Sequence, residues 1–336
     1  MIRLRIGYLI TGIITGLLLL LSFFTTIPDG KLHITFCDVG QGDGIYIRFP
    51  DGKDMVVDGG PGNKIISCLS RHMPFWDRSI DLALLTHPQK DHLTGLIAVL
   101  ERYRVQYLMR SDVGNSTEGF DVLTKLVKQK NMTEKFVTTG EMITVGPSTL
   151  SILWPSKEQI VSMKPKSNVT MQQCNNSSQT PCSSVLGVTT GSNLNDASVV
   201  FFLSYGLFDA LFPGDADSHV QPRMLSLRSA GLSESISGKD GSIELFKVPH
   251  HGSKTGMTDA FLQQISFVRG RLAKLNSSSQ QKSLAVISVG KNSYGHPAPE
   301  IIEKLTSAGF QILRTDKDGD IEVISDGKEW EVKKER

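Results

Sequence analysis

Four short polar strings in this chain each follow an apolar stretch that is typical of a buried strand. The strings are THPQKDH at residues 86–92, FPGD at 212–215, VPHHGS at 248–253 and SYGHP at 293–297. Each places imidazole or carboxylate groups where a strand gives way to a tight turn. Histidine nitrogens and carboxylate oxygens suit zinc, manganese and iron. We therefore predict that these strand ends meet at one edge of a β-rich fold and bind a divalent metal ion there.

Strand and helix patterns alternate along most of the chain and predict an α/β fold. Runs of β-branched and aromatic residues between glycine, aspartate and proline indicate strands, and apolar residues at helical spacing indicate helices. The strands are predicted at 32–39, 44–50, 54–60, 81–86, 105–110, 135–139, 142–145, 148–155, 197–206, 208–215, 243–249, 284–290, 310–315, 320–325 and 329–333. The helices are predicted at 64–73, 93–103, 119–130, 220–230, 259–265 and 299–308. Two rounds of similar composition favour two sheets packed between outer helices, with surface insertions at 156–193 and 269–283.

The N-terminal segment predicts a membrane anchor. Residues 6–27 contain no charged side chain, and a helix of this length rises about 33 Å, enough to cross a hydrocarbon core of about 30 Å. Arg3 and Arg5 precede it, so the positive-inside rule places the N-terminus in the cytoplasm. We expect residues 1–28 to be a retained single-pass anchor and residues 29–336 to form an extracytoplasmic domain. Cleavage as a signal peptide is the alternative, although no Ala-x-Ala-like pair follows the segment.

The charge balance limits the classes of partner. The 36 Lys and Arg residues nearly match the 34 Asp and Glu residues, and the net charge is +2. This balance argues against a protein that binds nucleic acid chiefly through bulk charge.

The four cysteines are interpreted for an oxidising compartment. Cys174 and Cys182 lie in a stretch rich in Ser, Thr, Asn and Gln, where a short-range disulfide is reasonable. Cys37 and Cys68 have apolar surroundings, and we predict small buried side chains without a reactive role.

Taken together, the polar strings resemble the metallo-β-lactamase hydrolase superfamily. The strings DVGQGD at 38–43, VVDGG at 56–60, KVPHHGS at 247–253 and SVGKNSYGHP at 288–297 narrow the likeness to the extracytoplasmic domain of ComEC-like proteins of bacterial competence DNA uptake. The likeness runs from about residue 31 to 325, apart from the two insertions. It implies a four-layer αββα sandwich with a metal site along one edge of the sheets, and a hydrolase that uses metal-bound hydroxide.

The resemblance also implies a ligand set for one or two divalent ions, zinc or manganese. One ion would be held by Asp91, His92, Asp215 and either His250 or His251. A second would be held by His87 together with Asp215. That second site departs from the superfamily pattern, because Gln89 stands where a histidine is usual and no histidine precedes Ser198. Asp196 is a candidate carboxylate in compensation.

Roles in catalysis and support follow from the same resemblance and from local sequence. Asp91 would orient the hydroxide or take its proton, and His296 would contact the scissile phosphate or protonate the leaving oxygen. Asp58 is predicted to hydrogen-bond the turn at 86–92. Gln41 and Asp43 either touch metal water or substrate, or simply belong to a glycine-rich turn.

The sequence thus favours a membrane-anchored, metal-dependent hydrolase, a phosphodiesterase or nuclease that acts on DNA beside a separate DNA-uptake channel protein. The DNA substrate rests on the resemblance. One alternative is a hydrolase of cell-envelope phosphoesters. Another is a binding or scaffolding protein with a degenerate metal site, which Gln89 favours and the retained Asp91, His92 and Asp215 disfavour.

Overall fold

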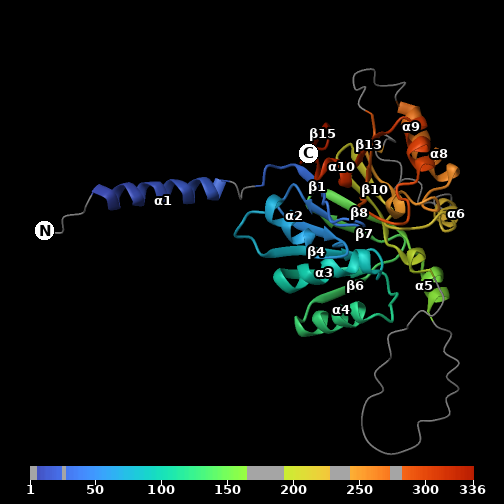
Figure 1. Cartoon of the computed structure of the whole chain (residues 1–336), viewed down its shortest axis with the longest axis horizontal. Helices are drawn as coiled ribbons and strands as arrows, with labels where there is room; N and C mark the ends of the chain where they lie inside the picture. The colour runs from blue at the N-terminus through green and yellow to red at the C-terminus, as the bar shows by residue number, and fades with distance from the viewer. Residues whose placement is uncertain (1–5, 25–27, 165–192, 228–242, 273–281) are drawn as a thin grey trace, which may run out of the picture.

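The computed structural model describes residues 6–24, 28–164, 193–227, 243–272 and 282–336. Within these ranges two β-sheets lie face to face, and helices cover the outer face of each sheet (Figure 1). The layers run helix, sheet, sheet, helix, which confirms the predicted α/β sandwich.

The first sheet contains eight strands in the order β15-β14-β1-β2-β3-β4-β5-β6. They are β1 (Leu32–Phe36), β2 (Ile45–Arg48), β3 (Asp54–Val57), β4 (Ser79–Leu85), β5 (Arg104–Arg110), β6 (Thr133–Phe136), β14 (Ile321–Ser325) and β15 (Trp330–Lys334). The pairs β1–β2 and β2–β3 are antiparallel, whereas β3, β4, β5 and β6 run parallel. Strands β1, β3 and β4 therefore point the same way, and their carboxyl ends share one edge.

The second sheet contains seven strands in the order β13-β12-β11-β10-β9-β8-β7. They are β7 (Met142–Val145), β8 (Ser148–Trp154), β9 (Val200–Tyr205), β10 (Phe208–Phe212), β11 (Leu245–Lys247), β12 (Leu284–Ile287) and β13 (Gln311–Arg314). Strands β10 to β13 are parallel, so the loops after β10, β11 and β12 also leave from one edge.

The helices form the outer layers and the connections. They are α1 (Ile6–Phe24), α2 (Lys64–His72), α3 (Lys90–Arg102), α4 (Glu118–Gln129), α5 (Lys157–Met163), α6 (Gln221–Leu227), α8 (Asp259–Leu272), α9 (Pro299–Ser307) and α10 (Thr315–Asp318), with the 3₁₀ turns η1 (Leu194–Ala197) and η3 (Pro249–Gly252). Helices α2, α3 and α4 pack on the first sheet, and α6, α8 and α9 pack on the second.

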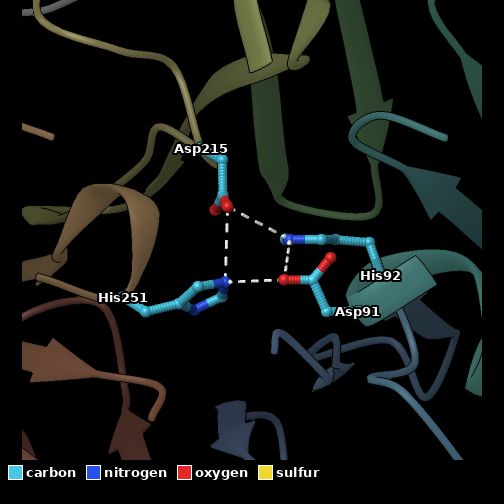
Figure 2. Close-up of side chains that lie close together, drawn as sticks. All are labelled: Asp91, His92, Asp215 and His251. Atoms are coloured by element: carbon cyan, nitrogen blue, oxygen red, sulfur yellow. Dashed lines mark ion pairs between the residues drawn. The ribbon is translucent and has the colours of Figure 1, made fainter. Parts of the chain in front are cut away.

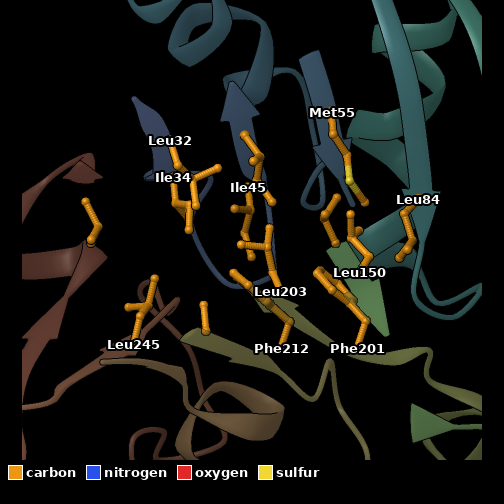
Figure 3. Close-up of a cluster of buried hydrophobic side chains, with 14 of the residues drawn as sticks. Leu32, Ile34, Ile45, Met55, Leu84, Leu150, Phe201, Leu203, Phe212 and Leu245 are labelled. Carbon is orange, nitrogen blue, oxygen red and sulfur yellow. The ribbon is translucent and has the colours of Figure 1, made fainter. Parts of the chain in front are cut away.

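The main core lies between the two sheets, because alternate side chains of each strand point inward (Figure 3). Ile34 and Phe36 of β1 face Phe201 and Phe212 of the second sheet. The Phe36 and Phe212 rings are 6.2 Å apart, and the Phe201 and Phe212 rings are 4.7 Å apart. Full burial of each such side chain stabilises the fold by about 1.5–3 kcal/mol. This core fixes one sheet against the other and so fixes the edge that both contribute.

Two glycines seat α3 against the end of β3. A Cβ atom on Gly59 would lie 2.0 Å from the backbone nitrogen of Leu96, and one on Gly95 would lie 1.8 Å from the Gly59 carbonyl oxygen. The Gly59 amide donates to the His92 carbonyl at 2.8 Å. Because only glycine allows this approach, the first turn of α3 is held at the same edge as the loop after β3.

Element boundaries differ from expectation where the site is built. Helix α3 begins at Lys90, three residues before the predicted start at 93, so Asp91 and His92 lie in its first turn. An acidic residue there is favoured by the helix dipole. In the predicted insertions, residues 157–163 form α5 and residues 269–272 continue α8, while residues 165–192 and 273–281 lie outside the described ranges.

The interpretation of Cys37 and Cys68 requires a correction. Both side chains are buried as predicted, but they form a disulfide that joins the loop after β1 to α2. The sheet brings residues that are 31 positions apart to a Cα–Cα distance of 5.8 Å, which no local pattern reveals. Cys174 and Cys182 lie outside the described residues.

A helix is present where the anchor was predicted. Helix α1 extends away from the sheets (Figure 1), and it exposes large apolar side chains such as Ile6, Tyr8 and Ile13. Across the described ranges, no helix combines the length and the apolar character needed to span a membrane.

The disulfide gives a first prediction. In a Cys174→Ser/Cys182→Ser background, the further pair Cys37→Ser/Cys68→Ser should lower the free energy of unfolding by about 3–4 kcal/mol, because the unfolded chain loses a loop constraint. Urea titration followed by circular dichroism measures the change. Adding reductant should destabilise the background protein and leave the quadruple variant unaffected. Equal stability of the two proteins under oxidising conditions would contradict the assignment.

Candidate metal centre

Four predicted ligands from three elements meet at the shared edge: Asp91 and His92 from α3, Asp215 from the loop after β10, and His251 from η3. One ligand atom from each lies within 4.8 Å of those of the others. The Nε2 atoms of His92 and His251 are each 3.3 Å from Oδ2 of Asp215. Figure 2 shows the four side chains pointing toward a common centre, with Asp91 opposite Asp215.

The two imidazoles are fixed through their far nitrogens. Nδ1 of His92 is 2.8 Å from Oδ2 of Asp58, and Nδ1 of His251 is 2.9 Å from the Ser288 carbonyl oxygen. When Nδ1 donates to these oxygens, Nε2 carries the lone pair and faces the cluster. Neither Nε2 atom has a hydrogen-bond partner among the described residues, although both are buried. Such orphaned nitrogens beside carboxylates fit a divalent ion, which would take all four side chains as ligands.

Asp58 hydrogen-bonds residues of the turn at 86–92. Its oxygens accept hydrogen bonds from the Thr86 amide at 2.8 Å and the Thr86 hydroxyl at 2.7 Å, in addition to the contact with His92. Its backbone is in the left-handed region with φ of 55°, a conformation that costs about 1–2 kcal/mol for a non-glycine residue. The carboxylate thereby ties the end of β4 to the first turn of α3.

The field of the site is negative. Burial disfavours a charged His92, but Asp215, Asp58 and Asp91 raise its pKa well above the usual value. The pKa of His251 is raised well above its usual value in the same way, against the effect of burial, by Asp215 and Asp43. A site that draws protons onto two buried imidazoles has an excess of carboxylate charge, which a bound dication would neutralise.

Lys247 supplies one fixed positive charge within this field. Its side chain is buried at the end of β11 and forms ion pairs with Asp43 and, at 3.4 Å, with Oδ1 of Asp215. It also donates to the Gly214 carbonyl at 2.9 Å. Asp43, predicted to touch metal water or substrate or to belong to a glycine-rich turn, is a buried partner of Lys247 and lies 3.5 Å from Nδ1 of His251.

The backbone of η3 separates the two adjacent histidines. His250 has φ, ψ of 49°, 46° and His251 has 54°, 24°, so both occupy the left-handed region. Two consecutive non-glycine residues in this region are strained, and strain of this kind gathers at functional sites. The result is that His251 joins the cluster, whereas Nδ1 of His250 contacts Asp217 at 2.9 Å.

His87 and Gln89 lie beside the cluster, outside its four ligands. The His87 ring is buried and centred 4.2 Å from that of His92, and Nδ1 lies 3.1 Å from the Thr86 hydroxyl. Burial, followed by His92, lowers the pKa of His87 to about 3, so this imidazole is neutral. The Gln89 amide donates to Oδ1 of Asn195 at 2.6 Å.

The remaining predicted residues are spread around the edge. Gln41 accepts from the Gly290 amide at 3.3 Å and links two edge loops. Asp196 forms an ion pair with His219 at 2.6 Å. His296 is partly buried, and its ring is centred 5.7 Å from that of His250. Burial, followed by His250, lowers the pKa of His296.

Sequence reasoning missed two residues of the site, Lys247 and Asp217. A lysine inside the apolar strand IELFKVP was a usable signal, because a charged side chain in a buried strand needs a partner. Asp217 follows Asp215 by two residues in PGDAD, and only the fold shows that Asp217 contacts His250 at 2.9 Å while Asp215 lies 3.3 Å from His251.

Comparison with known proteins supports the resemblance found in the sequence motifs. No known protein-family profile matches the chain. A match is found with ComE operon protein 3 of Bacillus subtilis (strain 168), which is 20% identical over 338 aligned positions that take in 94% of this chain. The chain spans 36% of the length of that relative. The match confirms the resemblance to ComEC-like proteins that the motifs indicated.

Similar solved structures include a metallo-β-lactamase fold protein, a metal-dependent hydrolase and a diphosphatase. YhfI from Bacillus subtilis has a TM-score of 0.46 and 11% identity, over 86% of this chain and 98% of that one. Tm1679, a metal-dependent hydrolase of the β-lactamase superfamily, has a TM-score of 0.44 and 12% identity, over 86% and 98% of the two chains. A diphosphatase of the PhnP family has a TM-score of 0.43 and 14% identity, over 88% and 98%.

The role of Lys247 gives a second prediction. Lys247→Met should lower the free energy of unfolding by about 3 kcal/mol in chelator, because it leaves Asp43 and Asp215 buried without their cation. Saturating Zn²⁺ should recover part of the loss, since a dication replaces the missing charge. Chemical unfolding in EDTA and in Zn²⁺ measures both effects, with the exposed Lys328→Met as the control. Equal stability of Lys247→Met and the parent chain in EDTA would contradict the assigned charge balance.

Proposed function

We propose that this chain is a metal-dependent hydrolase of phosphodiesters. The observation that carries the proposal is the convergence of Asp91, His92, Asp215 and His251 at the carboxyl edge of both sheets. A divalent ion held there supplies Lewis acidity, which acidifies water and offsets the charge of a phosphate. The surrounding carboxylate excess supports such an ion, and the far-side hydrogen bonds of both imidazoles pre-orient its ligands.

Asp91 is the member of the cluster that is open to solvent. Its side chain is 31% exposed, whereas those of His92, Asp215 and His251 are almost fully buried. Although burial raises its pKa, His92 and His251 lower that pKa below the usual value, so the group is a carboxylate at neutral pH. A carboxylate in this position would orient the attacking hydroxide through a hydrogen bond or take its proton.

In this proposal His296 contacts the substrate. Its Nδ1 is buried without a hydrogen-bond partner among the described residues, and His250 is its neighbour on the same side. An imidazole there contacts a phosphoryl oxygen or gives a proton to the leaving oxygen, as the sequence predicted.

The proposed substrate is DNA. The match with ComE operon protein 3 and the motifs of ComEC-like proteins support it. The net charge of +2 adds no independent support, because it provides little bulk attraction for a polyanion. Cell-envelope phosphoesters are the alternative substrate class, and a partner channel protein remains part of the proposal through the same resemblance.

The third prediction tests the activity. The full chain with Mn²⁺ or Zn²⁺ should cleave bis-p-nitrophenyl phosphate and DNA, and Asp215→Ala should lower the rate at least about 100-fold by removing one carboxylate ligand of the ion. EDTA should abolish turnover. Asp259→Asn, on the exposed start of α8, is the matched control and should retain full activity.

The outcomes separate three functions. Cleavage of single- or double-stranded DNA supports the proposal. Turnover of the small ester without cleavage of either DNA points to envelope phosphoesters. Tight metal binding with no turnover of any ester would contradict the hydrolase and favour a binding protein.

The proposed location is the outer face of a membrane, with the chain attached through residues 6–27. The support is the absence of charged side chains in that segment and the exposed apolar side chains of α1. In this arrangement the N-terminus is cytoplasmic and the sandwich is extracytoplasmic, where the Cys37–Cys68 disulfide is stable.

Membrane attachment gives the fourth prediction. The expressed chain should stay in the membrane pellet after carbonate washing, and Ile13→Lys/Leu17→Lys should release it, because each central lysine costs roughly 2.5–3.5 kcal/mol on insertion. Immunoblotting of both fractions measures the distribution, with Lys328→Glu as the control. Recovery of the parent chain in the soluble fraction would contradict the proposal.

A further inference from the structure

The second metal site, which the family resemblance builds on His87 and Asp215, has few ligand atoms among the described residues. A two-ion site holds its ions about 3.5–4 Å apart, and each ion needs protein ligands of its own in addition to a shared one. The described residues that could donate to a second ion are His87, Gln89, Asn195 and His250, of which His250 has Nε2 4.0 Å from Oδ2 of Asp215. Of these, His87 alone offers a buried imidazole nitrogen, Nε2, that has no hydrogen-bond partner.

Gln89 and Asn195 are bonded to each other. The Gln89 amide nitrogen donates to Oδ1 of Asn195 at 2.6 Å, so the oxygen of Asn195 already accepts a hydrogen bond from its neighbour. The Asn195 amide nitrogen lies 3.5 Å from the His250 ring. Neutral amides are weak ligands for zinc compared with imidazole and carboxylate.

His250 is held at the other end of the same polar chain. Nδ1 of His250 lies 2.9 Å from Oδ1 of Asp217, and that carboxylate also accepts from the Thr255 hydroxyl at 2.9 Å and from the Asn193 amide at 2.9 Å. Nε2 of His250 stays 4.0 Å from Oδ2 of Asp215. His250 therefore belongs to a network anchored on Asp217 and is absent from the four-residue cluster.

Both carboxylate oxygens of Asp215 already have partners in the protein. Oδ2 faces His92 and His251 at 3.3 Å, which is the side of the four-residue cluster. Oδ1 faces the buried ammonium group of Lys247 at 3.4 Å, and Lys247 also donates to the Gly214 carbonyl. A cation of the protein thus already lies beside the carboxylate that a second ion would have to share.

We infer that the centre holds a single resident ion, bound by Asp91, His92, Asp215 and His251. The second position is closed by the bonded amides of Gln89 and Asn195, and His250, which contacts Asp217, is not a ligand of the resident ion. The inference rests on the metal-dependent function proposed above, and it departs from a two-ion arrangement. With one ion, the charge that a second ion would contribute is supplied in part by Lys247.

Metal stoichiometry tests this inference without relying on activity. The full chain, purified without metal, is equilibrated with Zn²⁺ or with Mn²⁺, freed of unbound ion by gel filtration and analysed by plasma mass spectrometry. We expect one ion per chain. His251→Ala should fall below about 0.2 ions per chain, because a ligand of the ion is lost, while the adjacent His250→Ala should stay near one.

Restoring imidazoles should open the second position. Gln89→His/Asn195→His replaces the bonded amides with two donors and should raise the content from one ion toward two. Two ions on the parent chain would overturn the inference, as would loss of the ion in folded His250→Ala. A folded double variant that stays at one ion would overturn the assignment of closure to the amide pair.

A spectroscopic measurement on the parent chain tests the inference even if the variants fail to fold. The electron paramagnetic resonance spectrum of the Mn²⁺-loaded parent chain should show the six-line signal of an isolated ion, and a spin-coupled multiline signal would overturn the inference. Absence of ester turnover in a protein that binds one ion would count against the proposed function and would leave this inference standing.

Discussion

The site depends on two buried imidazoles whose far nitrogens are fixed. Asp58 holds Nδ1 of His92, and the Ser288 carbonyl holds Nδ1 of His251, so that both Nε2 atoms face Asp215. These contacts are made by the two halves of the sandwich, since Asp58 follows β3 of the first sheet and Ser288 follows β12 of the second. The packing of one sheet on the other therefore sets the distance between the ligands, and the inter-sheet core contributes to function as well as to stability.

The same edge of the sheets carries a large excess of negative charge. Four carboxylates are linked to one another through contacts with His92 and Lys247: those of Asp43, Asp58, Asp91 and Asp215. Among the described residues, Lys247 is their one buried ammonium partner. Burying carboxylates is costly unless they are paired. Lys247 offsets part of this charge and a bound dication would offset more, which explains why a lysine ends the otherwise apolar strand β11.

Sequence predicted the layers and most of the cluster, because both follow from strand ends. Parallel strands deliver their carboxyl ends to one edge, so Asp91, His92 and Asp215 could be expected to converge once each was placed after a buried strand. The choice between His250 and His251 could not be made, because it depends on two left-handed residues that no periodicity reveals. The Cys37–Cys68 pairing was missed for a similar reason, since the sheet creates the contact. The Gln89–Asn195 bond also required the fold, although the unusual glutamine marked its place.

The central claim is that one divalent ion lies among Asp91, His92, Asp215 and His251. Its most direct test is a crystal of the full chain equilibrated with Mn²⁺, with anomalous scattering recorded on both sides of the manganese absorption edge. The account predicts a single anomalous peak about 2.0–2.3 Å from the Nε2 atoms of His92 and His251 and from an oxygen of Asp91 and of Asp215. A peak elsewhere, or a structure in which His251 points away from Asp215, would contradict it.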